Sequence, residues 1–329
     1  MLDAPVLVLI DLEDQAGACA PTGPALELLT AARRLSGDVV ALCLRAPDAP
    51  GAAAIAGAGA SRLLVAELGD RSALAADAAD AVVAAARAVG PGAILVVSDY
   101  RGKELAGRAS VLLGSVAVSD AADLEEVDGE LRASKLVLSG SWSTTVSVAP
   151  QAEGTPIIAL RPGAVEAEAQ PGAAPLEAEA LAVEPAAETA AVELVSRESA
   201  SAATGPALGE ARTVVVGGRG VDGDFDLVRS LAEPLGAAVG ATRVACDEGW
   251  IERSAQIGQT GETISPRLYI SLGVSGAIHH TSGIQGAGTI VAICDDSEAP
   301  IFEMADYGVV GDVTEVVPQL VEELERLRG

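Results

Sequence analysis

Aromatic side chains are scarce in this sequence of 329 residues, since Phe, Trp and Tyr together make up 2% of it. A protein with so few aromatics lacks stacking platforms for single-stranded nucleic acid, and its core has to be built from aliphatic side chains. Basic residues are scarce as well: 21 Lys and Arg face 47 Asp and Glu, which gives a formal net charge of -26. Because a phosphate backbone must be met by clustered positive charge, the sequence argues against nucleic acid as a partner. Small molecules or other proteins are the expected partners.

Cysteines are few and widely spaced. Cys19, Cys43, Cys246 and Cys294 form no CxxC pair, so their spacing indicates neither a zinc site nor a disulfide framework, and it fits a reducing cytoplasm. The sequence has no apolar run long enough to cross a bilayer, and no basic segment precedes the apolar residues 5–10. We therefore expect a cytoplasmic protein that is not inserted into a membrane.

Short apolar runs alternate with Ala-rich stretches in the first half of the chain. Residues 6–10, 39–44 and 93–97 are typical of buried strands, and residues 24–35 are typical of an amphipathic helix that begins with a proline. This rhythm predicts a parallel α/β sheet. The pattern loosens after Gly114, where we expect a mixed sheet.

A stretch rich in Ala, Glu and Pro covers residues 163–190. This composition buries little surface, so we interpret the stretch as an acidic connector or a peripheral ribbon, and we place the inter-domain region here. Residues 192–195 resemble one further strand of the first domain. The expected N-terminal α/β domain therefore spans residues 1–200.

A second domain is expected over residues 211–329. It opens with an apolar strand at 213–216 and repeats the order of strand and helix up to a final helix that ends near Arg328. The predicted fold class is thus α/β with two domains, each with a mainly parallel sheet flanked by helices, and the C-terminal one is Rossmann-like.

A glycine pattern follows the first strand of the second domain. Gly218, Gly220 and Gly223 satisfy the GxGxxG spacing of a dinucleotide-binding turn. Glycine is abundant, with 36 residues, so an ordinary tight turn explains the match as well as a phosphate cradle does. A ribose-binding acidic residue is expected farther along the chain, and Asp247 matches that position only loosely. The pattern alone does not establish NAD binding.

Polar residues and glycines crowd the ends of further apolar strands, at residues 240–243, 256–261 and 273–280. The carboxyl ends of parallel strands are where ligands bind in such folds. These segments, in this order and followed by residues 298–308, resemble the electron-transfer flavoprotein alpha subunit. Residues 99–104 and 154–158 match the same family more loosely.

The resemblance implies an FAD held mainly by the second domain. It also implies a heterodimer with a beta subunit, whose carboxy-terminal segment helps to complete that domain and which shares a base with the first domain. The implied function is electron transfer without substrate turnover, from acyl-CoA dehydrogenases of fatty acid beta-oxidation or related flavin dehydrogenases to a membrane electron-transfer flavoprotein quinone oxidoreductase. No Ser-His-Asp, paired-carboxylate or thiolate arrangement stands out, which agrees with chemistry carried by a cofactor.

Three side chains match positions around the flavin ring. Arg243 matches the arginine over the isoalloxazine, Thr260 the hydroxyl that bonds flavin N5, and His280 the histidine beside flavin O2. An isolated arginine would more simply form a surface ion pair. His279 stands where the family usually has glutamine, and neighbouring histidines point in different directions, which disfavours a metal pair.

The remaining cofactor positions also come from the resemblance. Residues 275–278 match the segment that meets the pyrophosphate, although they could merely cap a helix. Cys294 stands where the family usually has asparagine near the adenosine, and a thiol is a poor hydrogen-bonding substitute. The full set of further matching positions is Arg219, Thr242, Gln256, Ile257, Gly258, Gln259, Gly261, Ser275, Gly276, Ala277, Ile278 and Asp312.

A function of another class remains open. The same glycine-rich strand ends would suit a non-redox subunit or module that binds an adenine nucleotide. A yellow colour in the purified protein distinguishes the two, because only a flavoprotein has it. The sequence does not decide whether the complex contains a second flavin and bifurcates electrons.

Overall fold

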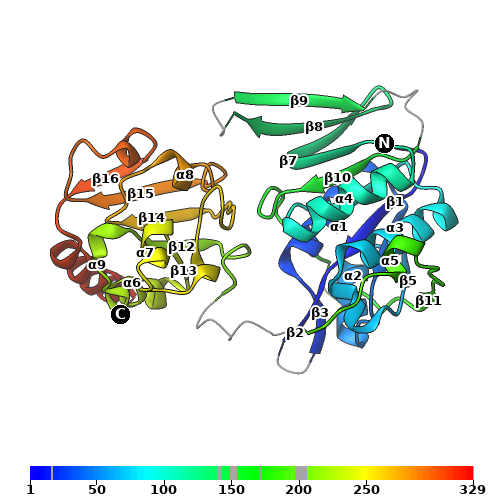
Figure 1. The fold of residues 1–329 in the computed structure, drawn as a ribbon, viewed down its shortest axis with the longest axis horizontal. Coiled ribbons are helices and arrows are strands. Elements are labelled where there is room, and N and C mark those ends of the chain that lie inside the picture. Colours follow the sequence, from blue (N-terminus) through cyan, green and yellow to red (C-terminus); the bar gives the residue numbers. More distant parts are fainter. Residues whose placement is uncertain (16–17, 139–141, 149–153, 171, 197–205, 329) are drawn as a thin grey trace. The chain divides into compact units, whose positions relative to one another are not determined.

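Uninterrupted apolar runs form the central strands of two separate sheets (Figure 1). The computed structural model describes all residues except 16–17, 139–141, 149–153, 171, 197–205 and 329. It divides the chain into two units, Met1–Glu198 and Ser199–Gly329.

The first unit is built on a sheet of nine strands in the order β11-β5-β4-β1-β6-β10-β7-β8-β9. The strands from β11 to β7 are parallel, whereas β7, β8 and β9 pair antiparallel, as the expectation of a mixed sheet beyond Gly114 requires. The bounds are β1 (Val6–Ile10), β4 (Val39–Cys43), β5 (Arg62–Val65), β6 (Ala93–Val97), β7 (Ala117–Val127), β8 (Glu130–Val137), β9 (Trp142–Val148), β10 (Ile157–Leu160) and β11 (Ala178–Ala180).

Helices cover both faces of this sheet, so its central strands are apolar on both sides. In β1, Val6 and Val8 contribute to the core shared with α1 (Gly23–Leu35) and α2 (Ala49–Gly57). Leu7, one residue along, belongs to the opposite core with α3 (Ala75–Val89) and α4 (Tyr100–Leu112). The side chain of Thr22 caps α1 by accepting from the Ala25 N–H.

Along the chain, an antiparallel hairpin of β2 (Leu12–Gln15) and β3 (Ala18–Pro21) lies between β1 and α1. The sequence pattern did not predict it. The short 3-10 helix η1 (Gly69–Ala73) lies between β5 and α3.

The Ala-, Glu- and Pro-rich segment lies on the first unit as a peripheral ribbon, one of its two expected forms. Its strand β11 pairs parallel with β5, the Gln170 N–H donates to the Gly57 carbonyl, and the short helix α5 (Ala187–Ala190) buries Thr189. The placement of the inter-domain region within this segment was wrong, because these contacts tie it to the first unit. Residues 192–195 are not a strand, since they pair with no other strand in the described chain.

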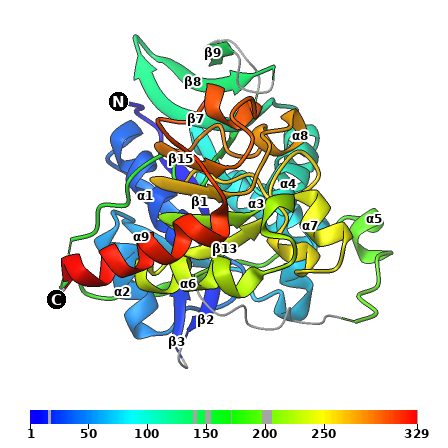
Figure 2. The same cartoon turned by 90° about the vertical axis from the view of Figure 1, so that its left-hand side faces the viewer.

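The second unit contains five parallel strands in the order β13-β12-β14-β15-β16. Figure 2 shows α6 (Phe225–Leu235) and α9 (Val313–Arg328) side by side on one face of the sheet, where Phe225 and Val317 join its core. The remaining bounds are β12 (Thr213–Gly217), β13 (Ala238–Ala241), β14 (Leu268–Leu272), β15 (Thr289–Cys294), β16 (Tyr307–Val310), α7 (Arg243–Asp247), α8 (Ile278–Thr281), η2 (Arg219–Val221), η3 (Arg253–Ala255) and η4 (Pro300–Glu303).

Both units are α/β with mainly parallel sheets flanked by helices, which confirms the predicted fold class. Across the described residues, no helix combines the length and the apolar character that crossing a bilayer demands.

Candidate functional site

The expected site residues of the second unit follow its parallel strands at their carboxyl ends. Because all five strands are parallel, these ends share one edge of the sheet, where ligands of such folds bind. The strands are spaced by roughly 4.8 Å, so the edge from β13 to β16 spans on the order of 19 Å. Along it, Thr242 and Arg243 follow β13, Arg219 follows β12, residues 275–280 follow β14, Cys294 ends β15 and Asp312 follows β16.

A cavity of about 100 Å³ opens beside the ends of β13 and β14. Its volume is smaller than the roughly 300–1,000 Å³ of typical ligand pockets, so the cavity can hold only one end of a dinucleotide. Most of its wall was expected from the sequence, whereas Val244 and Val274 were not. The lining residues are Thr242, Arg243, Val244, Gln256, Ile257, Thr260, Val274, Ser275, Ala277, His279 and His280.

Two loops form one wall of this cavity by packing backbone against backbone. Gly258 has a φ of +134°, and a Cβ there would stand 2.2 Å from the His279 carbonyl oxygen. The Gln259 N–H donates to that same oxygen at 2.7 Å, and Gly283 would bring a Cβ within 2.6 Å of the Gly258 nitrogen. Only glycine permits this approach, so the expected position Gly258 shapes the wall.

Thr260 is held by Gln256 with its hydroxyl at the cavity. The Gln256 Nε2 donates to the Thr260 Oγ1 at 3.0 Å, which leaves the hydroxyl hydrogen free to point elsewhere. The Gln256 side chain is 2% exposed, and its Oε1 has no hydrogen-bond partner within the described chain. A buried acceptor without a donor calls for a missing group, and a ligand in the cavity can supply it.

His280 is buried with both ring nitrogens occupied. Its Nδ1 lies 3.0 Å from the Ile257 carbonyl oxygen and has to donate, so its Nε2 accepts from the Tyr269 hydroxyl at 2.7 Å. Burial lowers the pKa of His280 to about 4, and the ring is neutral. Both ring nitrogens of His280 are thus bonded within the chain, and the match of His280 to the histidine beside flavin O2 stays a prediction.

Tyr269, whose hydroxyl donates to His280, was not predicted from the sequence. A buried Tyr hydroxyl has to find a partner, and that requirement is the only sequence signal that pointed to it. His279, by contrast, is exposed, and its Nδ1 lies 2.8 Å from the Gln259 Oε1. Gln259 and His279 therefore fasten the same two loops by their side chains as well.

Arg243 brings a positive charge to the mouth of the cavity. Its side chain is 56% exposed, and its Nε lies 3.7 Å from the Asp247 carboxylate. That carboxylate also accepts from the Arg253 Nη1 at the shorter distance of 2.9 Å. Asp247 therefore neutralises Arg243 only weakly, and the guanidinium remains able to act on a bound molecule.

Backbone donors gather where the chain passes from β14 into α8. The N–H groups of Ser275, Gly276, Ala277 and Ile278 find no acceptor in the described part of the chain. Gly276 has a φ of +83°, and a Cβ there would meet the Ile301 nitrogen at 2.3 Å. Successive free N–H groups of this kind suit anionic oxygens.

Eight expected residues do not line the cavity, namely Arg219, Gly258, Gln259, Gly261, Gly276, Ile278, Cys294 and Asp312. Gly258, Gln259, Gly261, Gly276 and Ile278 belong to the loops that form or adjoin its wall, and the other three lie elsewhere on the unit. Arg219 is exposed after β12, and the buried Cys294 thiol lies 3.8 Å from the Asp295 carboxylate. Asp312 caps α9 by accepting from the Thr314 N–H at 2.8 Å, and its hydrogen bonds to Thr314 lower its pKa.

The GxGxxG glycines are used for packing. A Cβ at Gly218 would lie 2.3 Å from the Gly273 carbonyl oxygen, and one at Gly220 would lie 2.7 Å from the Gly273 Cα. The turns after β12 and β14 thus touch each other, which accounts for Gly218 and Gly220 without a phosphate between them, and the φ of +85° accounts for Gly223.

Family comparison matches residues 207–285 to the electron transfer flavoprotein FAD-binding domain and residues 20–191 to the electron transfer flavoprotein domain. The electron transfer flavoprotein subunit alpha of Mycobacterium tuberculosis (strain H37Rv) is 43% identical over 99% of this chain and 100% of its own. That of Mycobacterium leprae is 40% identical over 92% of this chain and 94% of its own. The chain belongs to the electron transfer flavoprotein alpha subunit family.

The electron transfer flavoprotein match agrees with the geometry in two respects. Its FAD-binding region, residues 207–285, contains every residue that lines the cavity, and Cys294 and Asp312 lie beyond it. Its other region extends to residue 191 and so includes the ribbon on the first unit. A solved thiamine diphosphate-dependent decarboxylase of Rhodococcus jostii shares 14% identity at a TM-score of 0.22, over 92% of this chain and 54% of its own, which is too little to support an argument.

Proposed function

We propose that this chain is the alpha subunit of a heterodimeric electron carrier that holds FAD along the carboxyl edge of the second sheet. It accepts electrons from flavin dehydrogenases such as acyl-CoA dehydrogenases and delivers them to a membrane electron-transfer flavoprotein quinone oxidoreductase. The observation that carries the proposal is the coincidence of the family's FAD-binding region with the residues around the cavity.

The residues of the cavity fit a flavin ring at one end of an extended dinucleotide. Thr260 offers a hydroxyl hydrogen, Gln256 a buried oxygen that lacks a donor, and Arg243 a positive charge. When bound, the flavin supplies the redox chemistry itself. The free N–H groups of residues 275–278 would hold the pyrophosphate, and Cys294 and Asp312 lie farther along the edge on the adenosine side.

His280 acts in this proposal through the wall of the cavity. Its N–H fixes the Ile257 carbonyl, one residue from Gln256, and Tyr269 holds the ring from the core side. A neutral, fully bonded imidazole cannot supply a positive charge to the flavin. Arg243 is therefore the side chain of the cavity that favours the added electrons electrostatically.

Exposed apolar side chains support a beta subunit as the partner. On the edge strand β16 of the second unit, Tyr307 is 67% and Val310 58% exposed. An apolar sheet edge that pairs with no further strand of the described chain invites pairing with another chain, and we assign β16 to the beta subunit. In the first unit, Leu138 and Trp142 are exposed beside and on β9, which suits the shared base.

A cytoplasmic location agrees with the cysteines. Cys19, Cys43, Cys246 and Cys294 are all free thiols, as expected in a reducing compartment.

The purified heterodimer tests the proposal directly. It should be yellow, with a flavin absorbance band, and the colour should bleach when a reduced acyl-CoA dehydrogenase is added. A colourless heterodimer that takes up no FAD contradicts the proposal. Adenine-nucleotide binding without colour would favour the non-redox module instead.

Substitution of Arg243 tests its role at the ring. Arg243→Ala should lower the reduction potential of the bound flavin by on the order of tens of millivolts, because a fixed positive charge is removed from a solvent-exposed position. Spectroelectrochemical titration measures the shift. Arg229→Ala, which removes an exposed arginine on α6, is the matched control and should leave the potential unchanged.

A further inference from the structure

A second cavity, of about 290 Å³, lies in the first unit. Its wall comes from residues that follow β1, β4 and β6, together with part of η1. From β1 the chain builds β4 and β5 on one side and then crosses to β6 and β10 on the other. The cavity thus stands at the point where the strand order reverses, which is where open α/β sheets bind their ligands.

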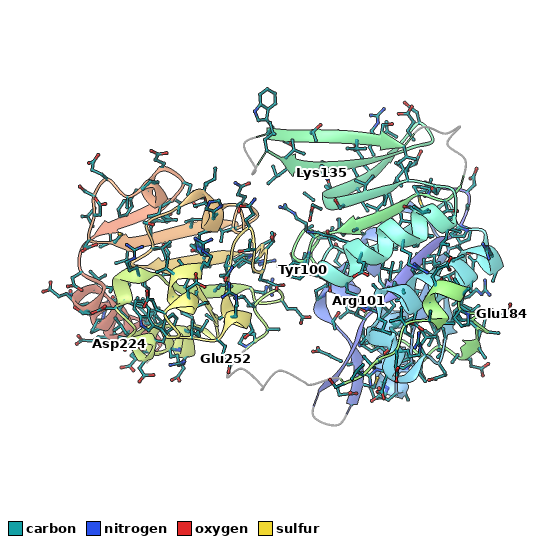
Figure 3. All side chains as sticks on the ribbon, viewed as in Figure 1. Tyr100, Arg101, Lys135, Glu184, Asp224 and Glu252 are labelled. Carbon is teal, nitrogen blue, oxygen red and sulfur yellow. The ribbon has the colours of Figure 1, made fainter. Side chains whose placement is uncertain are left out.

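Arg101 and Asp11 form the polar centre of this cavity. Figure 3 marks Arg101 at the start of α4, and its Nη1 donates to the Asp11 carboxylate at 2.8 Å. Its Nη2 donates to the Ser72 carbonyl at 2.7 Å, while its buried Nε has no partner in the described chain. A buried N–H without an acceptor indicates that a group is missing from the cavity.

Two carboxylates of the cavity wall can accept hydrogen bonds from a ligand. Asp11 is partly buried, and desolvation raises its pKa, with the neighbouring Asp99 adding to the rise and Arg101 opposing it. Asp99 uses its Oδ1 to cap α4 through the Gly102 N–H at 2.6 Å. Two carboxylates on one wall are well placed to accept from hydroxyl groups, as strand-end acids do from a ribose.

The cavity lacks the groups that usually bind a phosphate. Thr22 caps α1, the β2–β3 hairpin replaces the glycine-rich turn that would otherwise follow β1, and Asp99 caps α4. Both helix N-termini are therefore taken by side chains of the chain itself. Two arginines also line the cavity, but Arg45 is paired with Asp14 at 2.9 Å and Arg101 with Asp11 at 2.8 Å, so neither is free to attract an anion.

We propose that the cavity at the carboxyl ends of β1, β4 and β6 binds a small uncharged molecule with vicinal hydroxyl groups, a nucleoside or a sugar. The hydroxyls donate to Asp11 and Asp99, and an oxygen or ring nitrogen of the ligand accepts from the Arg101 Nε. The site lies wholly within the first unit and does not depend on the flavin proposed for the second.

Equilibrium dialysis of the heterodimer against labelled adenosine, ribose and AMP tests the proposal. Adenosine should bind at least fivefold more tightly than AMP, since the acids disfavour the phosphate. Asp11→Asn, which keeps the shape of the side chain, should weaken adenosine binding at least tenfold. Ala73→Leu, which fills the cavity from η1 without a change of charge, should abolish it.

The control variant is Asp226→Asn, which removes a carboxylate that is 95% exposed on α6 and should not affect binding. Ribose binding as tightly as adenosine supports the vicinal-hydroxyl chemistry and assigns the site to sugars. No binding to the folded heterodimer overturns the proposal, as does adenosine binding that both Asp11→Asn and Ala73→Leu leave intact. Tighter binding of AMP than of adenosine overturns the choice of an uncharged ligand.

Discussion

Tyr269 and His280 satisfy each other's hydrogen bonds in the core of the second unit. Tyr269 is fully buried, and the ring of His280 leaves no nitrogen for solvent. The sequence could not predict this pair, because residues 11 apart show no periodic relation until the strand and the helix are placed. Arg243 and Thr260, by contrast, were predicted from the resemblance and do line the cavity.

Loss of the tyrosine hydroxyl should destabilise the second unit. Tyr269→Phe leaves the His280 Nε2 buried without a donor, which costs about 1–3 kcal/mol of unfolding free energy. Urea unfolding measures the difference. Tyr307→Phe, at a side chain that is 67% exposed, should cost nothing measurable. Equal stabilities of the two variants would contradict the role assigned to the pair.

His280 should also make stability depend on pH. Its pKa is about 4 in the folded chain against an ordinary value of 6.5, so between these pH values only the unfolded chain takes up the proton. The contribution of the neutral ring to the free energy of unfolding is complete above pH 6.5. As the pH falls to about 4, the free energy of unfolding decreases by roughly 3 kcal/mol in all.

The parent chain should therefore lose more stability than His280→Gln over this window when both are unfolded in urea at stepped pH. His279→Gln, at the exposed neighbour, should follow the parent. Parallel pH profiles of the parent and His280→Gln would rule out a neutral buried ring.

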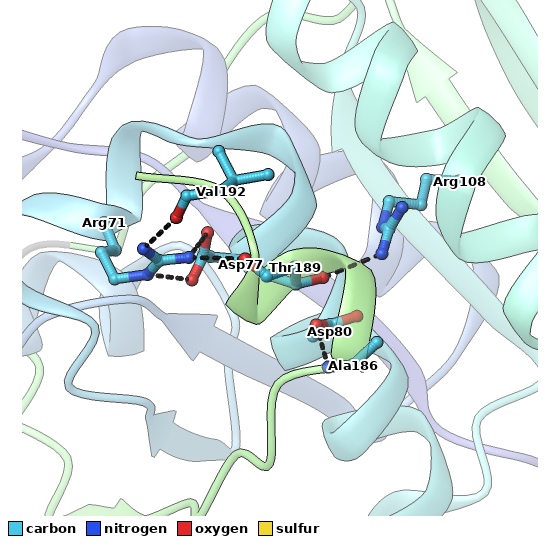
Figure 4. Close-up of polar contacts among 7 residues, drawn as sticks. All are labelled: Arg71, Asp77, Asp80, Arg108, Ala186, Thr189 and Val192. Atoms are coloured by element: carbon cyan, nitrogen blue, oxygen red, sulfur yellow. Dashed lines mark hydrogen bonds and ion pairs between the residues drawn. The ribbon is translucent and has the colours of Figure 1, made fainter. Parts of the chain in front are cut away.

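At the scale of elements, the ribbon is fastened to the first unit by charged side chains (Figure 4). Arg71 forms two hydrogen bonds with the Asp77 carboxylate and donates to the carbonyls of Thr189 and Val192. Arg108 donates to the Thr189 hydroxyl at 2.8 Å. Apolar side chains such as Val165, Leu181 and Val183 pack the ribbon against the two cores, and these polar contacts fix its end.

Removal of the Asp77 carboxylate should release this end. Asp77 is 5% exposed and Arg71 36%, so we expect Asp77→Ala to cost about 1–2 kcal/mol, less than for a fully buried pair. Glu-C protease should then cleave faster at Glu184 or Glu188. Asp226→Ala breaks an exposed Arg–Asp pair, with its carboxylate 95% exposed, and should change neither stability nor cleavage.

Element prediction succeeded where apolar runs are continuous. The runs at 6–10 and 93–97 coincide with β1 and β6, and the run at 213–216 lies in β12, because strands buried on both faces need apolar residues at every position. It failed in the ribbon. Three backbone pairs join β11 to β5, and the exposed residues of β11 carry no hydrophobic pattern that could reveal them.

For the whole molecule, association with the beta subunit should depend on the edge strand β16. Val309→Lys with Val310→Lys places two charges where apolar side chains would be buried, and we expect the affinity to fall at least tenfold. Co-purification and analytical ultracentrifugation measure it. Leu327→Lys, at an exposed apolar position near the end of α9, is the control. Undiminished affinity would place the partner elsewhere.

The position of the site could be predicted from the sequence, because it follows from the direction of the strands. Parallel strands bring their ends to one edge, so residues after β12 to β16 had to form a row once the sheet was predicted. The sequence did not reveal which of them enclose a cavity. That depends on the glycines that let two loops meet, and the spacing along the chain does not encode which backbones touch.

The touching loops have a consequence for the rate of electron transfer. With Gly258, Gly283 and the His279 carbonyl already in backbone contact, the wall has little space in which to shift when the charge beside it changes. Preorganised dipoles of this kind add little reorganisation energy to each oxidation and reduction. With the flavin of the proposed function against this wall, we expect the speed of electron transfer to be set by how closely a donor or acceptor protein can approach, rather than by relaxation of the wall.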